Sequence, residues 1–123
     1  MQASWQTIPH VFQFDKADIT DLEAFRKKYG KVVEKEGGKL TITAILLKIM
    51  AQALKAFPNF NASLDSEKDE VIFKNYFHIG VAVDTERGLL VPVIKDVDKK
   101  SIVNIAKELG EIAEKTRSKK NNA

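Results

Sequence analysis

The sequence predicts a single α+β domain, and three observations support this. Apolar residues recur at helical spacing in two long segments and again near the C-terminus. Between these segments, from residue 61 to residue 97, apolar residues alternate or form short runs bounded by turn residues, as strands do. The predicted order is β-α-α-β-β-β-α, which is typical of an α+β domain, and 123 residues suffice for a core.

Composition and charge exclude several classes of protein. The chain is 44% hydrophobic and 30% charged, as soluble globular proteins are. It has two histidines and no cysteine, so disulfides and thiolate zinc sites are excluded and we expect no metal. The net charge of +3 lies mostly in the C-terminal KTRSKKNNA, which has no nucleic-acid-binding motif, and no apolar run is long enough to span a bilayer. We expect no nucleic-acid or membrane partner, and a location in the bacterial cytoplasm or the mitochondrial matrix.

The first segment is predicted to form a strand followed by a helix. Residues 8–19 alternate loosely and are rich in β-branched and aromatic residues, which favours a strand. Thr20 and Glu23 have the spacing of a capping box, so the helix is expected over 21–36. The Gly-Gly pair that begins at Gly37 is a helix stop signal.

The segment 41–57 is predicted to be a buried helix that ends before Pro58. It is apolar on nearly every face, and its polar residues form one narrow stripe of Lys48, Gln52 and Lys55. We expect a sheet on one side of this helix and more protein on the other. Lys48 is unusual on such a helix, but its long stem can carry the ammonium group to the surface.

Strands are predicted in the second half. Residues 61–64 form a short strand, and 71–83 form one long strand, or two with a bend near Asn75. Residues 89–97 form the next strand and pair with it across a turn at 84–88.

Pro92 and Ser101 give further structural signals. Pro92 cannot donate to a strand ladder, so we expect it at an edge or a bulge. Ser101 can cap the N-terminus of the last helix, one face of which carries Ile102, Ile105, Ala106, Leu109, Ile112 and Ala113.

The stretch HIGVAVD at residues 78–84 has one face with almost no side chains. The bulky residues Phe77, Ile79, Val81 and Val83 alternate with His78, Gly80, Ala82 and Asp84. Small residues on a strand face let a ligand or another backbone approach closely.

Each ionisable residue of this stretch has two interpretations. His78 is a candidate general base, but a histidine bonded to a neighbouring backbone group is the favoured interpretation; the same holds more strongly for His10. Asp84 could accept a hydrogen bond from a ligand, although its position alone favours a turn residue. The residues by themselves show no self-sufficient active site.

Four stretches together resemble the catalytic domain of the 2-oxo acid dehydrogenase acyltransferases: IPHVFQFDKADITDLEAFRKK, LLKIMAQALKAFPNFNASLD, NYFHIGVAVDTERGLLVPVIKDVDKKSI and ELGEIAEKTRSKK. They cover nearly the whole chain in the family's order. The first stretch is most similar to the acetyl-transferring members of bacterial pyruvate dehydrogenase complexes. Succinyl-transferring and branched-chain acyl-transferring relatives remain alternatives.

The resemblance implies part of a chloramphenicol-acetyltransferase-like fold, a mixed sheet with helices packed on it. It implies homotrimers that build a larger core, dehydrogenase-complex partners, and a lipoyl group on a separate domain as acyl donor to coenzyme A. Asp84 matches the family's channel aspartate, and we place His78, Gly80 and Gly88 beside that channel. The residues that could contact coenzyme A are Lys48, Asn61 and Arg87.

The resemblance also implies that residues 1–123 are the N-terminal half of the catalytic domain. The family's His-x-x-x-Asp-Gly motif, whose histidine deprotonates the coenzyme A thiol, does not occur in the sequence. We therefore expect no catalytic residue here, and an acyltransferase by family whose fragment is inactive alone. The alternative is a non-catalytic assembly or interaction fragment.

Overall fold

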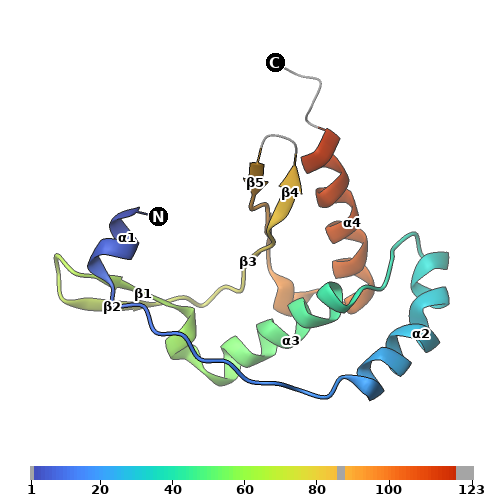
Figure 1. The fold of residues 1–123 in the computed structure, drawn as a ribbon, viewed down its shortest axis with the longest axis horizontal. Helices are drawn as coiled ribbons and strands as arrows, with labels where there is room; N and C mark the ends of the chain where they lie inside the picture. Colours follow the sequence, from blue (N-terminus) through green and yellow to red (C-terminus); the bar gives the residue numbers. More distant parts are fainter. Residues whose placement is uncertain (1, 86–87, 119–123) are drawn as a thin grey trace.

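The computed structural model describes residues 2–85 and 88–118, and it confirms an α+β architecture. The α-helices are α1 (Gln2–Thr7), α2 (Thr20–Lys35), α3 (Ile42–Ala56) and α4 (Ile102–Ser118), with short 3-10 helices η1 (Pro58–Asn61) and η2 (Val97–Lys99). The strands are β1 (Ala62–Asp65), β2 (Glu70–Phe73), β3 (Ile79–Gly80), β4 (Val83–Thr85), β5 (Gly88–Leu90) and β6 (Val93–Ile94). Figure 1 shows α4 beside the β4–β5 hairpin, while α1 and the β1–β2 hairpin lie at the far end of the molecule from α2.

The predicted strand at 8–19 is wrong. These residues have no regular secondary structure, and the chain runs from α1 to α2 as an extended arm (Figure 1). The side chains of Val11 and Phe14 are 89% and 90% exposed. A strand needs a neighbour to satisfy its backbone N–H and C=O groups, and none of the described strands pairs with this arm.

The predicted capping box at the start of α2 is also wrong. The helix begins at Thr20, with Ile19 as its N-cap and no side-chain cap. Asp18 instead accepts the Thr20 hydroxyl at 2.5 Å and the Thr20 N–H at 2.9 Å, and these bonds lower the pKa of Asp18. Glu23 pairs with Arg26, whose hydrogen bond lowers the pKa of the Glu23 carboxyl. A carboxylate two residues earlier is the stronger acceptor, so the hydroxyl turns away from the helix.

The glycine stop after α2 is confirmed. Gly37 has a φ of +82°, and its N–H donates to Glu34 O while the Gly38 N–H donates to Val33 O, both at 3.0 Å. These two bonds form a Schellman motif. A Cβ on Gly38 would lie 3.0 Å from Lys107 Cγ, so this glycine lets the α2–α3 loop approach α4 closely.

The core lies where α3 meets α4, η2 and β6. Its buried residues include Ala44, Ile45, Leu47 and Ala51 of α3, packed with Ile94, Val97, Ile105 and Ala106. Strand β6 contributes Ile94 to this core and Ile79 of its partner β3 packs against it, so the sheet expected beside α3 is present only as a small two-stranded pair, next to the helices α4 and η2. The other side of α3 is exposed: Leu46, Ile49 and Met50 are each about half exposed. This is the side on which we expect more protein to pack.

The predicted strand at 71–83 is interrupted. It forms β2, β3 and β4, and the described strands make three antiparallel pairs, β1–β2, β3–β6 and β4–β5. In the last two pairs the partners keep one register, from Ile79 opposite Ile94 to Thr85 opposite Gly88, so they are two parts of one hairpin. The ladder breaks at Pro92, which accepts the Val81 N–H at 3.0 Å but has no N–H to return. We call residues 78–95 the split hairpin.

The last helix begins as predicted. The Ser101 hydroxyl accepts the Asn104 N–H at 3.2 Å, and Ile105 and Ala106 face the core. In the part of the chain that the structure describes, no helix is long and apolar enough to cross a membrane.

Candidate functional site

The two faces predicted for residues 77–84 are present in the split hairpin. Ile79 and Val81 pack against the core, and Val83 is 6% exposed. The face with almost no side chains points outward, because all its members are exposed: His78, Gly80, Ala82 and Asp84. Packing in the core explains why the inward-facing residues of this strand are bulky and apolar. It does not explain why the outward-facing residues are small, so these residues are candidates for a functional role.

The second strand adds an apolar ridge to the same outward face. Leu89 lies directly opposite Asp84, and Val93 lies opposite Gly80. Val91 lies between them in the sequence. The side chains of Leu89, Val91 and Val93 are 65%, 56% and 49% exposed. A Cβ on Gly80 would lie 2.8 Å from Val91 Cγ1, so the glycine makes room for this ridge.

This ridge was missed from sequence. In GLLVPVI the residues that face outward and those that face the core are all apolar, so there is no alternation to separate them. The outward-facing residues could have been identified from the pairing register with residues 79–85, and that register depends on placing the turn at 84–88 correctly.

His78 is held by backbone, as the favoured interpretation predicts. Its Nδ1 accepts the Asp96 N–H at 3.0 Å, so the proton of the neutral ring lies on Nε2. Asp96 reaches this position with a left-handed backbone, φ +50°. The Tyr76 ring packs on the imidazole with a centroid distance of 4.6 Å. His78 is therefore oriented, but by an amide and not by a carboxylate.

Asp84 does not close the turn that follows it. The Thr85 hydroxyl donates to Gly88 O at 2.7 Å, and Gly88 has a φ of +103°. Among the described residues the exposed Asp84 carboxylate has no hydrogen-bond partner. The hydrogen bond that closes the turn is therefore made by Thr85 and Gly88, and not by Asp84. Arg87, predicted as a coenzyme A contact, lies outside the described residues.

The other two predicted coenzyme A contacts bind backbone carbonyls. Lys48 Nζ donates to Asp98 O at 2.8 Å and to Lys100 O at 2.6 Å. The Asn61 amide donates to Lys74 O and Tyr76 O, both at 2.9 Å. Both residues hold together segments that are far apart in the sequence, and their contact with coenzyme A stays a prediction.

A second lysine of the α3 polar stripe forms an ion pair beside Lys48. Lys55 Nζ lies 3.1 Å from Asp98 Oδ2 and 5.3 Å from the centre of the Phe77 ring. Burial raises the pKa of Asp98, but the hydrogen bond and charge of Lys55, with the charge of Lys99, outweigh it and lower the pKa overall. The polar stripe is therefore the surface that holds η2 against α3.

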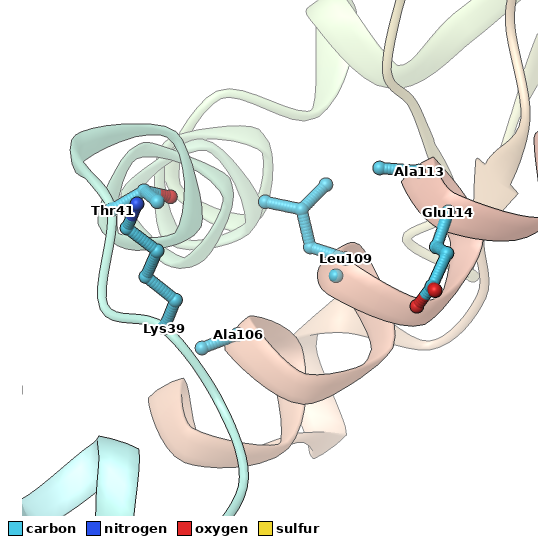
Figure 2. Close-up of a pocket in the computed structure, with 7 residues that line it drawn as sticks. Lys39, Thr41, Ala106, Leu109, Ala113 and Glu114 are labelled. Atoms are coloured by element: carbon cyan, nitrogen blue, oxygen red, sulfur yellow. The ribbon is translucent and has the colours of Figure 1, made fainter. Parts of the chain in front are cut away.

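An open hollow of about 720 Å³ lies between α4 and the α2–α3 loop. Figure 2 shows Leu109 extending into it from α4, with Lys39 and Thr41 on the opposite wall. None of the predicted site residues lines this hollow. Among the described residues no group of three or more His, Asp or Glu side chains could hold a metal ion. The split hairpin therefore remains the candidate site.

Comparison with known proteins assigns the family. The profile described as 2-oxoacid dehydrogenases acyltransferase (catalytic domain) matches residues 1–123. The chain is 54% identical over 120 residues to the dihydrolipoyllysine-residue acetyltransferase component of the pyruvate dehydrogenase complex of Azotobacter vinelandii, covering 98% of this chain and 19% of that protein. It is 47% identical over 120 residues to the same component of Bacillus subtilis, covering 98% and 27%. The chain thus spans less than a third of these relatives.

Solved structures agree. The cubic core of the pyruvate dehydrogenase multienzyme complex matches with a TM-score of 0.92 at 54% identity, covering 97% of this chain and 49% of that chain. A probable dihydrolipoamide acetyltransferase from Listeria monocytogenes matches with a TM-score of 0.88 at 37% identity, covering 98% and 51%. The chain therefore belongs to the 2-oxoacid dehydrogenase acyltransferase family and corresponds to sequence within its catalytic domain.

Proposed function

We propose that this chain is part of a dihydrolipoyllysine-residue acetyltransferase of a pyruvate dehydrogenase complex, which transfers acetyl between dihydrolipoamide and coenzyme A. The observation that carries the proposal is 54% identity over 98% of the chain to an acetyltransferase component of that complex. The close backbone similarity to part of a cubic pyruvate dehydrogenase core supports it. The relatives compared above are acetyl-transferring, which favours acetyl over succinyl or branched-chain acyl groups.

The chemistry of the proposed reaction is thioester exchange. The coenzyme A thiolate attacks the acetyl carbonyl of acetyl-dihydrolipoamide, which requires a base for the thiol and donors for the oxyanion. His78 does not fill the role of base, because Asp96 N–H occupies its Nδ1. We place the base and the oxyanion donor outside these 123 residues, which cover about half of the solved chains.

The part assigned to this chain is one wall of the substrate channel. The outward face of the split hairpin has a free carboxylate at Asp84 and small residues at Gly80 and Ala82, with the Val91 side chain lying close over Gly80. Such a face suits a thin, extended lipoyl or pantetheine arm. We further propose that the complete domain has the chloramphenicol-acetyltransferase-like fold and assembles as trimers. The exposed arm at 8–19 and the open side of α3 are surfaces that such an assembly would cover.

The experiment is acetyl transfer from acetyl-coenzyme A to dihydrolipoamide, measured on the assembled core that carries this sequence and on the isolated 123-residue chain. We expect turnover by the core and none by the isolated chain. A core that binds coenzyme A but transfers only succinyl or branched-chain acyl groups would refute the acetyl assignment. A core without any transfer would favour the alternative, a fragment kept for assembly.

A further inference from the structure

The chain at the entry to the split hairpin is held by η2 and not by strand pairing. Phe77 and His78 precede β3 and lie outside its ladder. The Phe77 carbonyl accepts the Val97 N–H, and His78 Nδ1 accepts the Asp96 N–H, both at 3.0 Å. Because the β3–β6 ladder is only two residue pairs long, the place of the hairpin depends on these two bonds as well.

The turn that presents these two N–H groups depends on anchors outside itself. Asp96 has a φ of +50°, a left-handed backbone that costs free energy for a residue other than glycine and persists only where the surroundings fix it. Lys99 pairs with Asp96 at 3.4 Å, but both side chains are exposed, so this pair contributes little. The remaining anchors are Lys48 and Lys55, and both come from α3.

Of these two lysines, Lys55 contacts both η2 and the entry to the hairpin. Its Nζ lies 3.1 Å from Asp98 Oδ2 and 5.3 Å from the centre of the Phe77 ring. The Asp98 side chain is only 11% exposed, so its carboxylate needs a cation close by, whereas the Lys55 side chain is 43% exposed. Lys48 binds only the backbone carbonyls around η2.

We propose that Lys55 is a positioning residue for the proposed acetyl transfer. Through Asp98 it holds η2, and η2 holds Phe77 and His78, so the split hairpin keeps one place relative to α3. The inference rests on the proposed function, in which the split hairpin is a wall of the substrate channel, and Lys55 itself touches no substrate. A shift of about 1 Å in a surface that orients substrates lowers a rate by up to about 100-fold.

The first test separates orientation from binding in the assembled core. Lys55→Met is compared with Lys55→Arg, which keeps the charge, and with Gln52→Met, an exposed position on the same polar stripe. The quantities measured are kcat for acetyl transfer and the Kd for coenzyme A. We expect Lys55→Met to lower kcat about tenfold with an unchanged Kd, because the substrates still bind but are oriented less often. Lys55→Arg and Gln52→Met should match the parent core.

The second test follows the route through η2. Hydrogen–deuterium exchange, read by mass spectrometry on the same cores, should show the amides of Asp96 and Val97 exchanging about fivefold faster or more in Lys55→Met, with the β1–β2 hairpin unchanged. Asp98→Leu leaves no unpaired carboxylate in the interior, so it can fold even if Lys55→Met cannot. It should lower kcat as Lys55→Met does, and adding Lys55→Met to it should lower kcat no further.

Each other outcome contradicts a specific step. Faster exchange in Lys55→Met with unchanged kcat would make Lys55 a purely structural residue and overturn the proposal. Lowered kcat with unchanged exchange at Asp96 and Val97, or a further fall when Lys55→Met is added to Asp98→Leu, would overturn the route through η2. A parent core without acetyl transfer would instead refute the proposed function, and the exchange rates would still show whether Lys55 holds η2.

Discussion

Lys48 connects α3 to η2, and removing its ammonium group separates a structural role from coenzyme A binding. The ammonium donates to the backbone carbonyls of Asp98 and Lys100 at 2.8 and 2.6 Å. Lys48→Met keeps the length and apolar packing of the stem but leaves both carbonyls without this donor. The matched control is Gln52→Met, on the same polar stripe but exposed.

The expected loss follows from the two bonds. A hydrogen bond from a charged donor contributes about 1.5–3 kcal/mol, and Lys48 is only half-buried, so water can replace part of the pair. We expect a total loss of about 2–3 kcal/mol in the free energy of unfolding. For a domain of this size that lowers Tm by roughly 6–15 °C.

Calorimetric Tm and the Kd for coenzyme A should be measured on the same Lys48→Met protein. We expect a lowered Tm, an unchanged Tm in Gln52→Met, and an unaltered Kd for the folded fraction. An unchanged Tm together with a raised Kd would refute this reasoning. It would return Lys48 to the coenzyme A contacts predicted from the family resemblance.

Three further changes test other parts of the structure. If Asp84 accepts a hydrogen bond from substrate as proposed, Asp84→Asn weakens that charged bond and should lower kcat/KM of the assembled core about tenfold or more with Tm unchanged; lowered Tm with normal kinetics would make Asp84 structural. Gly38→Ala should destabilise by about 1–3 kcal/mol in chemical denaturation, because its Cβ meets α4, whereas Gly110→Ala, with open space around it, should stabilise. Burial raises the pKa of Asp98, but the hydrogen bond and charge of Lys55, with the charge of Lys99, outweigh it and hold that pKa below its ordinary 3.8; stability from this pair is therefore fully present above pH 3.8 and is lost as pH falls through the lowered pKa. Acid titration followed by circular dichroism should show this loss in the parent and not in Asp98→Asn.

The sequence predicted the elements whose signals are local. The helix at 41–57, the glycine stop at Gly37 and the Ser101 cap all depend on residues within one or two turns of each other. The irregular position of Pro92 was also predictable, since its missing N–H interrupts a ladder in any fold. The family resemblance likewise came from the order of short stretches, which needs no tertiary information.

The local signals failed where a competing or missing partner decided the outcome. The predicted capping box did not form because the Thr20 hydroxyl donates to Asp18, a charged acceptor just outside the predicted pattern. The arm at 8–19 has a strand pattern, but a strand exists only when another strand satisfies its backbone, and a pattern in one segment does not name that partner.

The sequence by itself determined which face of residues 77–84 is buried, because bulky and small residues alternate there. Only the tertiary structure decided what the polar stripe of α3 does and what lies beside the small residues Gly80 and Ala82. Lys48 meets carbonyls fifty residues away, and the outward ridge of Leu89, Val91 and Val93 is hidden in a run that is apolar on both faces. Both depend on contacts between distant segments, and residue spacing along one segment carries no information about which distant segment will lie against it.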